Sequence, residues 1–263
     1  MTKKGCVVHN MVYVTGDVHA EFNKFSTKNF PQQKEMSRDD YIIVCGDFGI
    51  WHDCPEERYW LDWLSKKPFT LLFVDGNHEN FDRLKNEFPV VDFHGGKAHK
   101  IRDNVYHLMR GYVFDLCGKK FFAFGGASSH DIQDGILYFE DYPDTNALVK
   151  DYNRRTEQGQ MLRINKISWW KEELPTKYEM QRGRDNLKKV GYKVDYVISH
   201  CLPQSMVIHL YGGGTDSDVL TKYFERLVQN GLQFKQWYAG HYHSDMRLLG
   251  NYNILYHKIE RIL

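Results

Sequence analysis

Five short apolar runs constrain the fold of this chain more than any other feature of its sequence. They span Met11–Thr15, Tyr41–Cys45, Phe69–Asp75, Val194–Ser199 and Phe234–Ala239. Each run is rich in β-branched or aromatic residues and too short for a free-standing helix, so each predicts a strand. Helix-like stretches over Pro55–Lys66 and Asn80–Glu87 alternate with the first runs. This alternation predicts an α/β protein with a mostly parallel sheet.

The pattern changes beyond the third run. Residues Lys97–Phe124 alternate short strands with turns, which predicts a meander joining a second sheet. The last residues, Asp245–Leu263, predict one more hairpin. We therefore expect a single domain over 1–263.

Residues 127–193 stand apart by their charge. The part up to residue 149 has five acidic residues and no Lys or Arg, while the part from residue 150 has twelve basic and six acidic residues. We predict that this segment is an inserted helical cap. Its two halves either neutralise each other or place a basic wall beside an anionic substrate.

Composition limits the class of protein. Among 263 residues, 35 are Lys or Arg and 34 are Asp or Glu, which gives a formal charge of +1. Domains that hold nucleic acid by bulk charge are usually strongly basic, so this class is disfavoured. No apolar run approaches the roughly 18–20 residues that span a bilayer, and we find no signal-peptide pattern. The odd number of cysteines, without CxxC spacing, predicts reduced thiols in a cytoplasmic protein; they are Cys6, Cys45, Cys54, Cys117 and Cys201.

Residues of the metal-ligating kind follow all five predicted strands. In chain order they are Asp17 and His19, then Asp47, then Asn77 and His78, then His200, and finally His241 and His243. The ligand site of an open α/β sheet lies beyond the carboxyl ends of its strands, so these side chains can converge on one crevice. Glycines precede most of them and allow sharp turns there.

The chemistry of this set favours two transition-metal ions. Carboxylate and amide oxygens mixed with imidazole nitrogens suit Mn, Fe or Zn better than Ca or Mg alone. Two divalent ions roughly 3.5–4 Å apart can activate a hydroxide and clamp a phosphoryl group during in-line attack. A carboxylate between the ions offsets their repulsion, and Asp47 is the natural candidate.

The ordered blocks D-x-H, G-D, G-N-H-[DE], H and G-H-x-H resemble those of the calcineurin-like metallophosphoesterases. Here they read Asp17-Val18-His19, Gly46-Asp47, Gly76-Asn77-His78-Glu79, His200 and Gly240-His241-Tyr242-His243. The resemblance implies a four-layer α-β-β-α sandwich of two mixed sheets. It also implies one metal ion on Asp17, His19, Asp47 and His243, and a second on Asp47, Asn77, His200 and His241. His78 would stabilise the phosphoryl group or protonate the leaving oxygen.

Two further segments bear on the substrate. The second block continues as GDFGIWHD instead of the GD-x-x-DRG of protein serine/threonine phosphatases, so we do not expect a phosphoprotein phosphatase. The segment Ser168–Pro175, SWWKEELP, resembles one in bacterial relatives of unsettled substrate. Outside the blocks, His52 and His130 are candidates to line the cleft.

We therefore expect a dinuclear metal-dependent phosphoesterase that hydrolyses a P–O bond by metal-activated hydroxide. A small phosphorylated substrate or a nucleotide is the expected partner, nucleic acid is a further candidate, and no membrane is expected. A nuclease or cyclic-nucleotide phosphodiesterase on the same site is the first alternative. A non-catalytic scaffold would have lost ligands, and a metallo-amidase would not explain GNHE or GDVH. The oligomeric state stays open.

Overall fold

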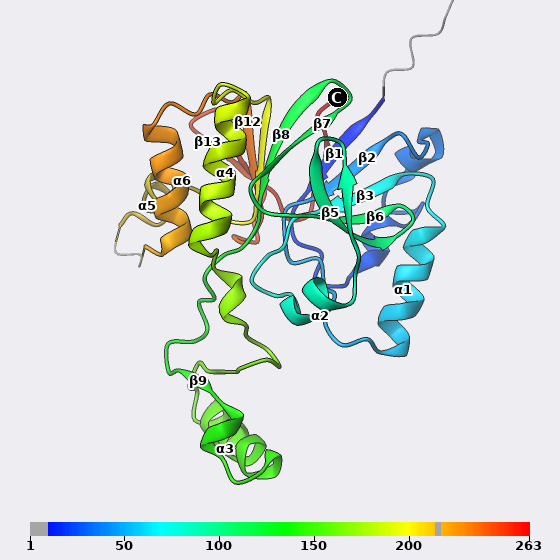
Figure 1. Ribbon diagram of the computed structural model, residues 1–263. Helices are drawn as coiled ribbons and strands as arrows, with labels where there is room; N and C mark the ends of the chain where they lie inside the picture. The colour runs from blue at the N-terminus through cyan, green and yellow to red at the C-terminus, as the bar shows by residue number, and fades with distance from the viewer. Residues whose placement is uncertain (1–9, 214–216) are drawn as a thin grey trace, which may run out of the picture.

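Two β-sheets packed face to face form the centre of the molecule, which a computed structural model describes over residues 10–213 and 217–263 (Figure 1). The first sheet has the strand order β15-β1-β2-β3-β6-β5-β4, and the second has the order β13-β14-β12-β11-β8-β7. The strands of the first sheet are β1 (Val12–Thr15), β2 (Tyr41–Val44), β3 (Thr70–Phe73), β4 (Val90–Phe93), β5 (Gly96–Arg102), β6 (Val105–Leu108) and β15 (Ile259–Arg261). Those of the second are β7 (Tyr112–Leu116), β8 (Lys119–Phe124), β11 (Tyr196–Ser199), β12 (Gln236–Ala239), β13 (Met246–Leu248) and β14 (Tyr252–Ile254).

Parallel strands form the middle of each sheet. Strands β1, β2, β3 and β6 run parallel, as do β8, β11, β12 and β14. Antiparallel partners complete the edges of both sheets. All five predicted strands are present, and their carboxyl ends lie at the same end of the two sheets (Figure 1).

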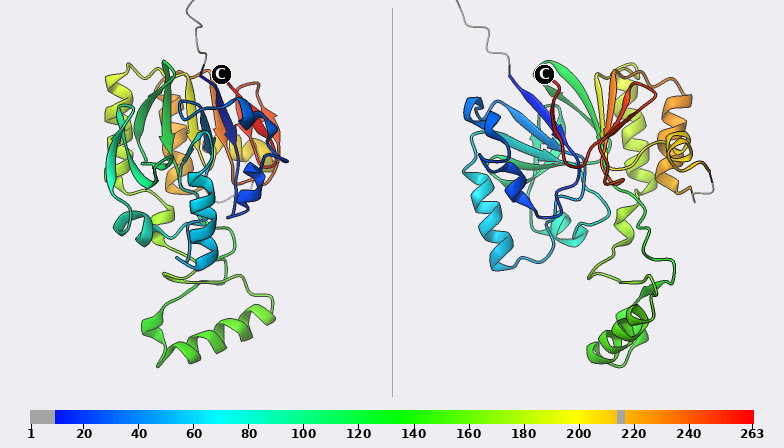
Figure 2. Two further views of the ribbon diagram at one scale, coloured as in Figure 1. Left: turned by 90° about the vertical axis from the view of Figure 1, so that its right-hand side faces the viewer. Right: turned by 180° about the vertical axis from the view of Figure 1, so that it is seen from behind.

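Helices cover the outer face of each sheet (Figure 2). Helices α1 (Pro55–Ser65) and α2 (Phe81–Asn86) lie on the first sheet, and α4 (Lys177–Lys189), α5 (Gln204–Tyr211) and α6 (Val219–Gln229) lie on the second. Short 3₁₀ turns span Phe22–Phe25, Pro31–Glu35, Phe139–Asp141 and Lys171–Glu173. The predicted four-layer α-β-β-α sandwich is therefore confirmed. No helix in the described ranges is both long and apolar enough to cross a bilayer.

Strands buried on both faces explain the continuous apolar runs of the sequence. In β1, Val12 and Val14 pack between the sheets, while Tyr13 faces the opposite cluster beneath the helices of the first sheet. Successive side chains of a strand point to opposite faces, so both faces must be apolar where both are covered.

The predicted meander over Lys97–Phe124 is divided between the sheets. Strands β5 and β6 extend the first sheet, and β7 and β8 belong to the second. The expectation that the whole meander joins a second sheet was therefore wrong. Apolar alternation identifies strands but carries no information about which sheet each one joins. The predicted last hairpin is present as β13 and β14, after which β15 returns to pair with β1.

The segment 127–193 separates into two structural parts. Helix α4 packs on the second sheet, where Gly183 lies against Phe122 and Phe124. Residues 136–164 instead project from the body as an arm (Figures 1 and 2). The arm pairs β9 (Ile136–Leu137) with β10 (Arg163–Ile164) and contains α3 (Thr145–Glu157).

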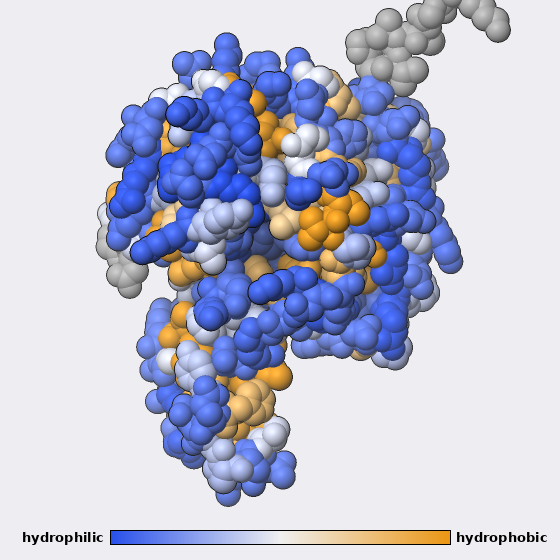
Figure 3. All heavy atoms as spheres, in the orientation of Figure 1, coloured by the Kyte–Doolittle hydropathy of each residue, from blue (hydrophilic) through white to orange (hydrophobic). Residues whose placement is uncertain are grey.

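The arm has a small core of its own and a mixed surface. Leu137, Leu148, Leu162 and Ile164 form that core. Its surface carries apolar side chains among polar ones (Figure 3), and Met161 is 48% exposed. At the root, Arg163 pairs with Asp131, so this contact favours the view that the two charged halves of the segment neutralise each other.

Candidate metal centre

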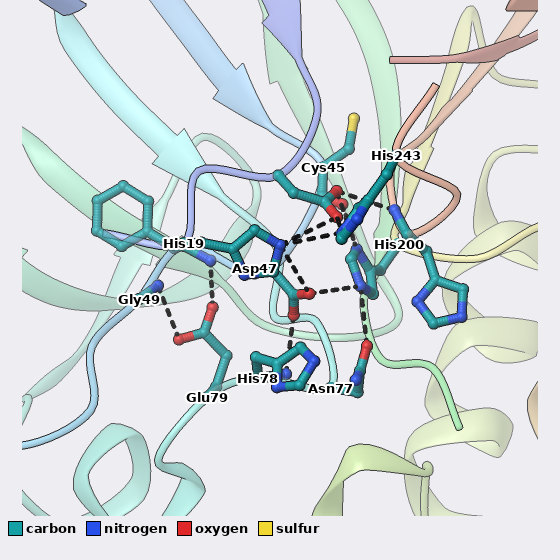
Figure 4. A network of polar contacts seen from close by, with 12 residues as sticks. His19, Cys45, Asp47, Gly49, Asn77, His78, Glu79, His200 and His243 are labelled. Carbon is teal, nitrogen blue, oxygen red and sulfur yellow. Dashed lines mark hydrogen bonds and ion pairs between the residues drawn. The ribbon is translucent and has the colours of Figure 1, made fainter. Parts of the chain in front are cut away.

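The loops after β1, β2, β3, β11 and β12 bring the predicted ligands together at one edge of the sandwich (Figure 4). A first group consists of Asp17, His19 and His243. His243 Nε2 lies 3.1 Å from Asp17 Oδ2 and 3.1 Å from His19 Nε2. These residues come from opposite ends of the chain, and only the packing of the two sheets makes them neighbours.

A second group consists of Asp17, Asp47 and His200, with Asn77 beside it. His200 Nε2 lies 3.3 Å from Asp47 Oδ2 and 3.2 Å from Asn77 Oδ1. The same Asp47 Oδ2 lies 3.8 Å from His19 Nε2 in the first group. Asp47 therefore stands between the two groups, as expected of a bridging carboxylate.

His241 occupies a different position from the other predicted ligands. Its ring lies against His200, with the centroids 4.9 Å apart, but its Nε2 meets His130 Nε2 at 2.8 Å. Its backbone N–H donates to Asp17 Oδ1 at 2.9 Å. His130 thus lies at the site, whereas His52 is exposed and has no side-chain contact to any predicted ligand among those described.

Several ligand residues adopt a backbone conformation that is costly for side chains other than glycine. The φ angles of His19, Asp47, His241 and His243 are 48°, 46°, 67° and 46°. Residues held in the left-handed region cost on the order of 1–3 kcal/mol each and cluster at functional sites. The sharp turns expected at these blocks are therefore made largely by the ligand residues themselves.

The preceding glycines serve a second purpose, which is close packing. A Cβ on Gly46 would overlap the ring of His200, and one on Gly240 would overlap Asp17 Oδ1. Gly46 also has a φ of +99°. These positions need glycine because a ligand from another loop fills the space of the missing side chain.

Buried side chains outside the ligand set hold the loops in place. The carboxylate of Glu79 accepts backbone N–H groups from Phe48 at 2.6 Å and from Gly49 and Ile50 at 3.3 Å (Figure 4). Burial nevertheless raises the pKa of Glu79 well above its ordinary value. The backbone N–H of His78 donates to Asp47 Oδ1 at 2.8 Å, which leaves its imidazole beside the ligand groups.

The electrostatics of the site suit a cation. Asp17 and Asp47 are 3% and 1% exposed, and the buried Asp17 Oδ2 has no assigned hydrogen bond within the described residues, although the imidazole of His243 lies 3.1 Å away. Burial favours a neutral imidazole at His200, but the carboxylates of Asp47 and Asp17 raise its pKa to about 10. Burial alone would raise the pKa of Asp17, yet the charge of His200 keeps it well below its ordinary value. Two buried carboxylates, an orphaned oxygen and converging imidazoles fit divalent metal ions.

Two cavities flank the centre. One, of about 460 Å³, lies between residues 128–133 and helices α5 and α6, with His130 and His241 in its wall. The other, of about 260 Å³, is lined by Asp17, His19 and Lys24. Lys24 Nζ donates to the carbonyl of Asp17 at 3.3 Å, and burial lowers the pKa of Lys24 to about 8.

Sequence patterns missed several residues that shape this site. Nothing in the sequence distinguishes Lys24. Trp51, whose indole donates to the backbone carbonyl of His78, stood out only as a departure from the phosphatase pattern. Ser129 follows the end of β8, a position that could have identified it, because loops at that edge surround the site. Of the cysteines, four are free thiols, and Cys6 lies outside the described residues.

The chain matches a known protein family. The family model described as calcineurin-like phosphoesterase matches residues 11–245, which include every predicted ligand. No curated protein matches the chain.

Proposed function

The chain belongs to the calcineurin-like phosphoesterase family, whose members hydrolyse phosphoesters with the help of metal ions, and from this we propose that it is a dinuclear phosphoesterase. The single observation that carries the dinuclear proposal is the position of Asp47. Its Oδ2 lies 3.8 Å from His19 Nε2 and 3.3 Å from His200 Nε2, so one buried carboxylate serves both ligand groups.

Each ligand group would hold one metal ion. Asp17, His19, Asp47 and His243 would hold one divalent ion, and Asp47, Asn77, His200 and His241 the other, with Mn, Fe or Zn as candidates. Such ions supply Lewis acidity and lower the pKa of a water molecule. His241 would need its Nδ1 or a rotated ring to contribute, because its Nε2 faces His130.

We propose that His78 contacts the substrate directly. Its ring lies 5.6 Å from that of His19, and its peptide N–H is held by Asp47. From there it can donate a hydrogen bond to the phosphoryl group or a proton to the leaving oxygen. Asn77 has an amide N–H that is turned away from the ligand groups, so its Oδ1 is the atom that faces them.

The larger cavity favours an uncharged organic group on the substrate. Its described lining includes Gln133, Tyr211, Asp218 and Tyr242, and none of the described lining residues is Lys or Arg. Among the described lining residues, a second phosphate would meet the carboxylate of Asp218 and no Lys or Arg. We therefore propose a small phosphoester or nucleotide as substrate, and that the 127–193 segment contributes to substrate choice through His130 and its neighbours.

Metal analysis combined with a substrate panel tests this function. We expect about two Mn²⁺ per chain and metal-dependent hydrolysis of p-nitrophenyl phosphate, a monoester, or of its bis-ester, a diester. Asp47→Asn should lower the occupancy of both ions together with hydrolysis, because Asp47 is the one residue that we assign to both ions. Asp53→Asn, at an exposed acid of the same loop, is the matched control and should change neither.

The alternatives are distinguished in the same panel. Cleavage of single-stranded DNA or cyclic AMP with no turnover of the small esters would establish the nuclease or cyclic-nucleotide phosphodiesterase instead. A chain that binds two Mn²⁺ and hydrolyses none of these substrates would point to the scaffold. The cytoplasmic location stays a prediction.

A further inference from the structure

The amide of Asn77 has to be oriented before it can serve as a ligand. Its oxygen and nitrogen are nearly the same size, and only the oxygen can bind a metal ion. Asn77 is 4% exposed, so water cannot set its orientation. Its Oδ1 faces His200 Nε2 at 3.2 Å, and its Nδ2 donates to Ser129 Oγ at 3.3 Å. His200 lies on the oxygen side of this amide, and the serine hydroxyl is the described acceptor on its nitrogen side.

The direction of the Ser129 hydroxyl is itself determined by Glu173. Ser129 Oγ–H donates to Glu173 Oε2 at 2.6 Å, and the Ser129 backbone N–H donates to Glu173 Oε1 at 3.0 Å. A serine hydroxyl has one proton, and Ser129 donates it in the hydrogen bond to Glu173 Oε2. Only a lone pair remains for Asn77, so Oγ can accept from its amide N–H₂ but cannot donate to its oxygen.

The backbone that carries Glu173 is held in place by Arg110. Glu173 is 1% exposed. The guanidinium of the buried Arg110 donates to the backbone carbonyls of Glu172 and Glu173 at 2.8 and 3.3 Å and also pairs with Asp75. Asp75 lies two residues before Asn77, so one arginine fixes both ends of the chain of hydrogen bonds.

We propose that Ser129 and Glu173 are positioning residues for the metal centre, acting by holding the Oδ1 of Asn77 toward the second ligand group. This inference rests on the proposed dinuclear function. It gives the segment Ser168–Pro175 a role, because this stretch between the arm and α4 supplies Glu173. Trp170 of the same stretch is 4% exposed and donates to Asp82 at 3.1 Å, so it anchors the segment.

Mn²⁺ binding separates this role from a structural one. In Ser129→Ala the amide of Asn77 loses the acceptor that holds its nitrogen away from the ligand group. Residues that orient a ligand typically contribute 10- to 100-fold to metal affinity. We expect the Kd of the second Mn²⁺ to rise by roughly that factor while the first is unchanged. In electron paramagnetic resonance, the spin-coupled signal of the Mn pair should give way to that of isolated Mn.

A near-isosteric variant tests the direction of the hydrogen bonds. In Glu173→Gln the new amide can donate to Ser129 Oγ, which frees the serine proton to donate to the oxygen of Asn77. The Asn77 amide should then turn its nitrogen toward the metal. We expect Glu173→Gln to weaken the second site at least as much as Ser129→Ala, with the fold retained.

Two controls complete the experiment. Ser129→Thr keeps the hydroxyl and should restore the coupled Mn signal. Ser128→Ala removes a hydroxyl that lines the adjacent cavity. Within the described residues this hydroxyl makes no hydrogen bond to a predicted ligand, so both Mn²⁺ affinities should stay unchanged. If Ser129→Ala does not fold, the second-site Mn²⁺ affinity of Glu173→Gln tests the positioning role.

The possible failures have different meanings. A wild-type chain that binds two Mn²⁺, with unchanged second-site affinity in both Ser129→Ala and Glu173→Gln, overturns the positioning role and leaves the proposed function intact. A wild-type chain that binds fewer than two Mn²⁺ contradicts the dinuclear function and the positioning role together.

Discussion

The indole Nε1–H of Trp51 donates to the backbone carbonyl of His78 at 2.6 Å. The carbonyl of Trp51 in turn accepts from Asn80 Nδ2 at 2.9 Å, so the loop after β2 holds the loop after β3 on both sides of His78. Trp51 occupies the position of the arginine in the GD-x-x-DRG pattern of the protein phosphatases. In this chain the same position supports the peptide that carries His78.

Trp51→Phe should therefore reduce turnover without loss of metal. The substitution keeps most of the ring but removes one hydrogen bond, and such a bond contributes about 0.5–1.5 kcal/mol. If this hydrogen bond stabilises the transition state by that amount, its loss lowers kcat by up to about tenfold. Steady-state kinetics and metal analysis of the same preparation check this. An unchanged kcat would mean that the His78 peptide does not need the indole.

His78→Ala should lower turnover more than Trp51→Phe does, and it should likewise leave the metal content nearly unchanged. No atom of its ring belongs to the two converging ligand groups in the described part of the chain. Loss of a general acid typically costs on the order of 10²–10⁴-fold in rate. The loss should shrink for p-nitrophenyl esters, whose leaving group needs little protonation. Metal content that collapses with activity would identify His78 as a ligand.

The stability of the protein should depend on pH through His99, which is not among the proposed metal ligands. His99 Nδ1 meets His107 Nδ1 at 2.9 Å, and His107 Nε2 meets Asp75 Oδ1 at 3.0 Å. Burial, with a contribution from His107, lowers the pKa of His99 from 6.5 to about 3. Between these values the unfolded chain binds more protons than the folded one, so the free energy of unfolding rises with pH. This contribution is complete above about pH 6.5 and is lost as the pH falls toward 3.

His99→Gln removes the titrating group and keeps a donor for His107. Urea unfolding between pH 4 and 7 should then show a weaker dependence on pH than the wild type. His52→Gln, at an exposed histidine, is the control and should keep the wild-type slope. Parallel curves for His99→Gln and the wild type would argue against a lowered pKa at this position.

Gly183→Ala should destabilise the fold although it improves helix propensity. Alanine in a helix interior gains roughly 0.5–1 kcal/mol over glycine. Here the new Cβ would overlap Tyr223 Oη and lie 3.3 Å from both Phe122 and Phe124. Overpacking of this kind costs typically 1–3 kcal/mol, so we expect a net loss of about 1–2 kcal/mol in urea unfolding.

Tyr223→Phe provides the matched test of that clash. The Tyr223 hydroxyl is buried and has no hydrogen-bond partner in the described part of the chain, so its removal should cost little by itself. It also removes the atom that the new Cβ would overlap. The double variant should therefore be more stable than the sum of the single effects predicts. Simple additivity would mean that the helix shifts instead of clashing.

The sequence alone determined the strands, the α/β class and the set of ligand residues. Strand runs such as Tyr41–Cys45 carry a local signal, because a strand covered on both faces must be apolar along its length. The ligands were recognisable because each, like Asp47, directly follows such a run. The resemblance of the five blocks added the two mixed sheets, and the structure and the family match agree with it.

Only the tertiary structure decided how these parts meet. It divided the strands of Lys97–Phe124 between two sheets and placed α4 on the second sheet, because sheet membership depends on partners distant in sequence. It also turned the Nε2 of His241 toward His130 and joined Asn77 to Ser129 and Glu173. Short sequence patterns indicate which faces of a helix or strand must be apolar. The partner of a buried hydrogen bond is fixed only when segments 44 or 52 residues apart are packed together, as in Ser129–Glu173 and Asn77–Ser129.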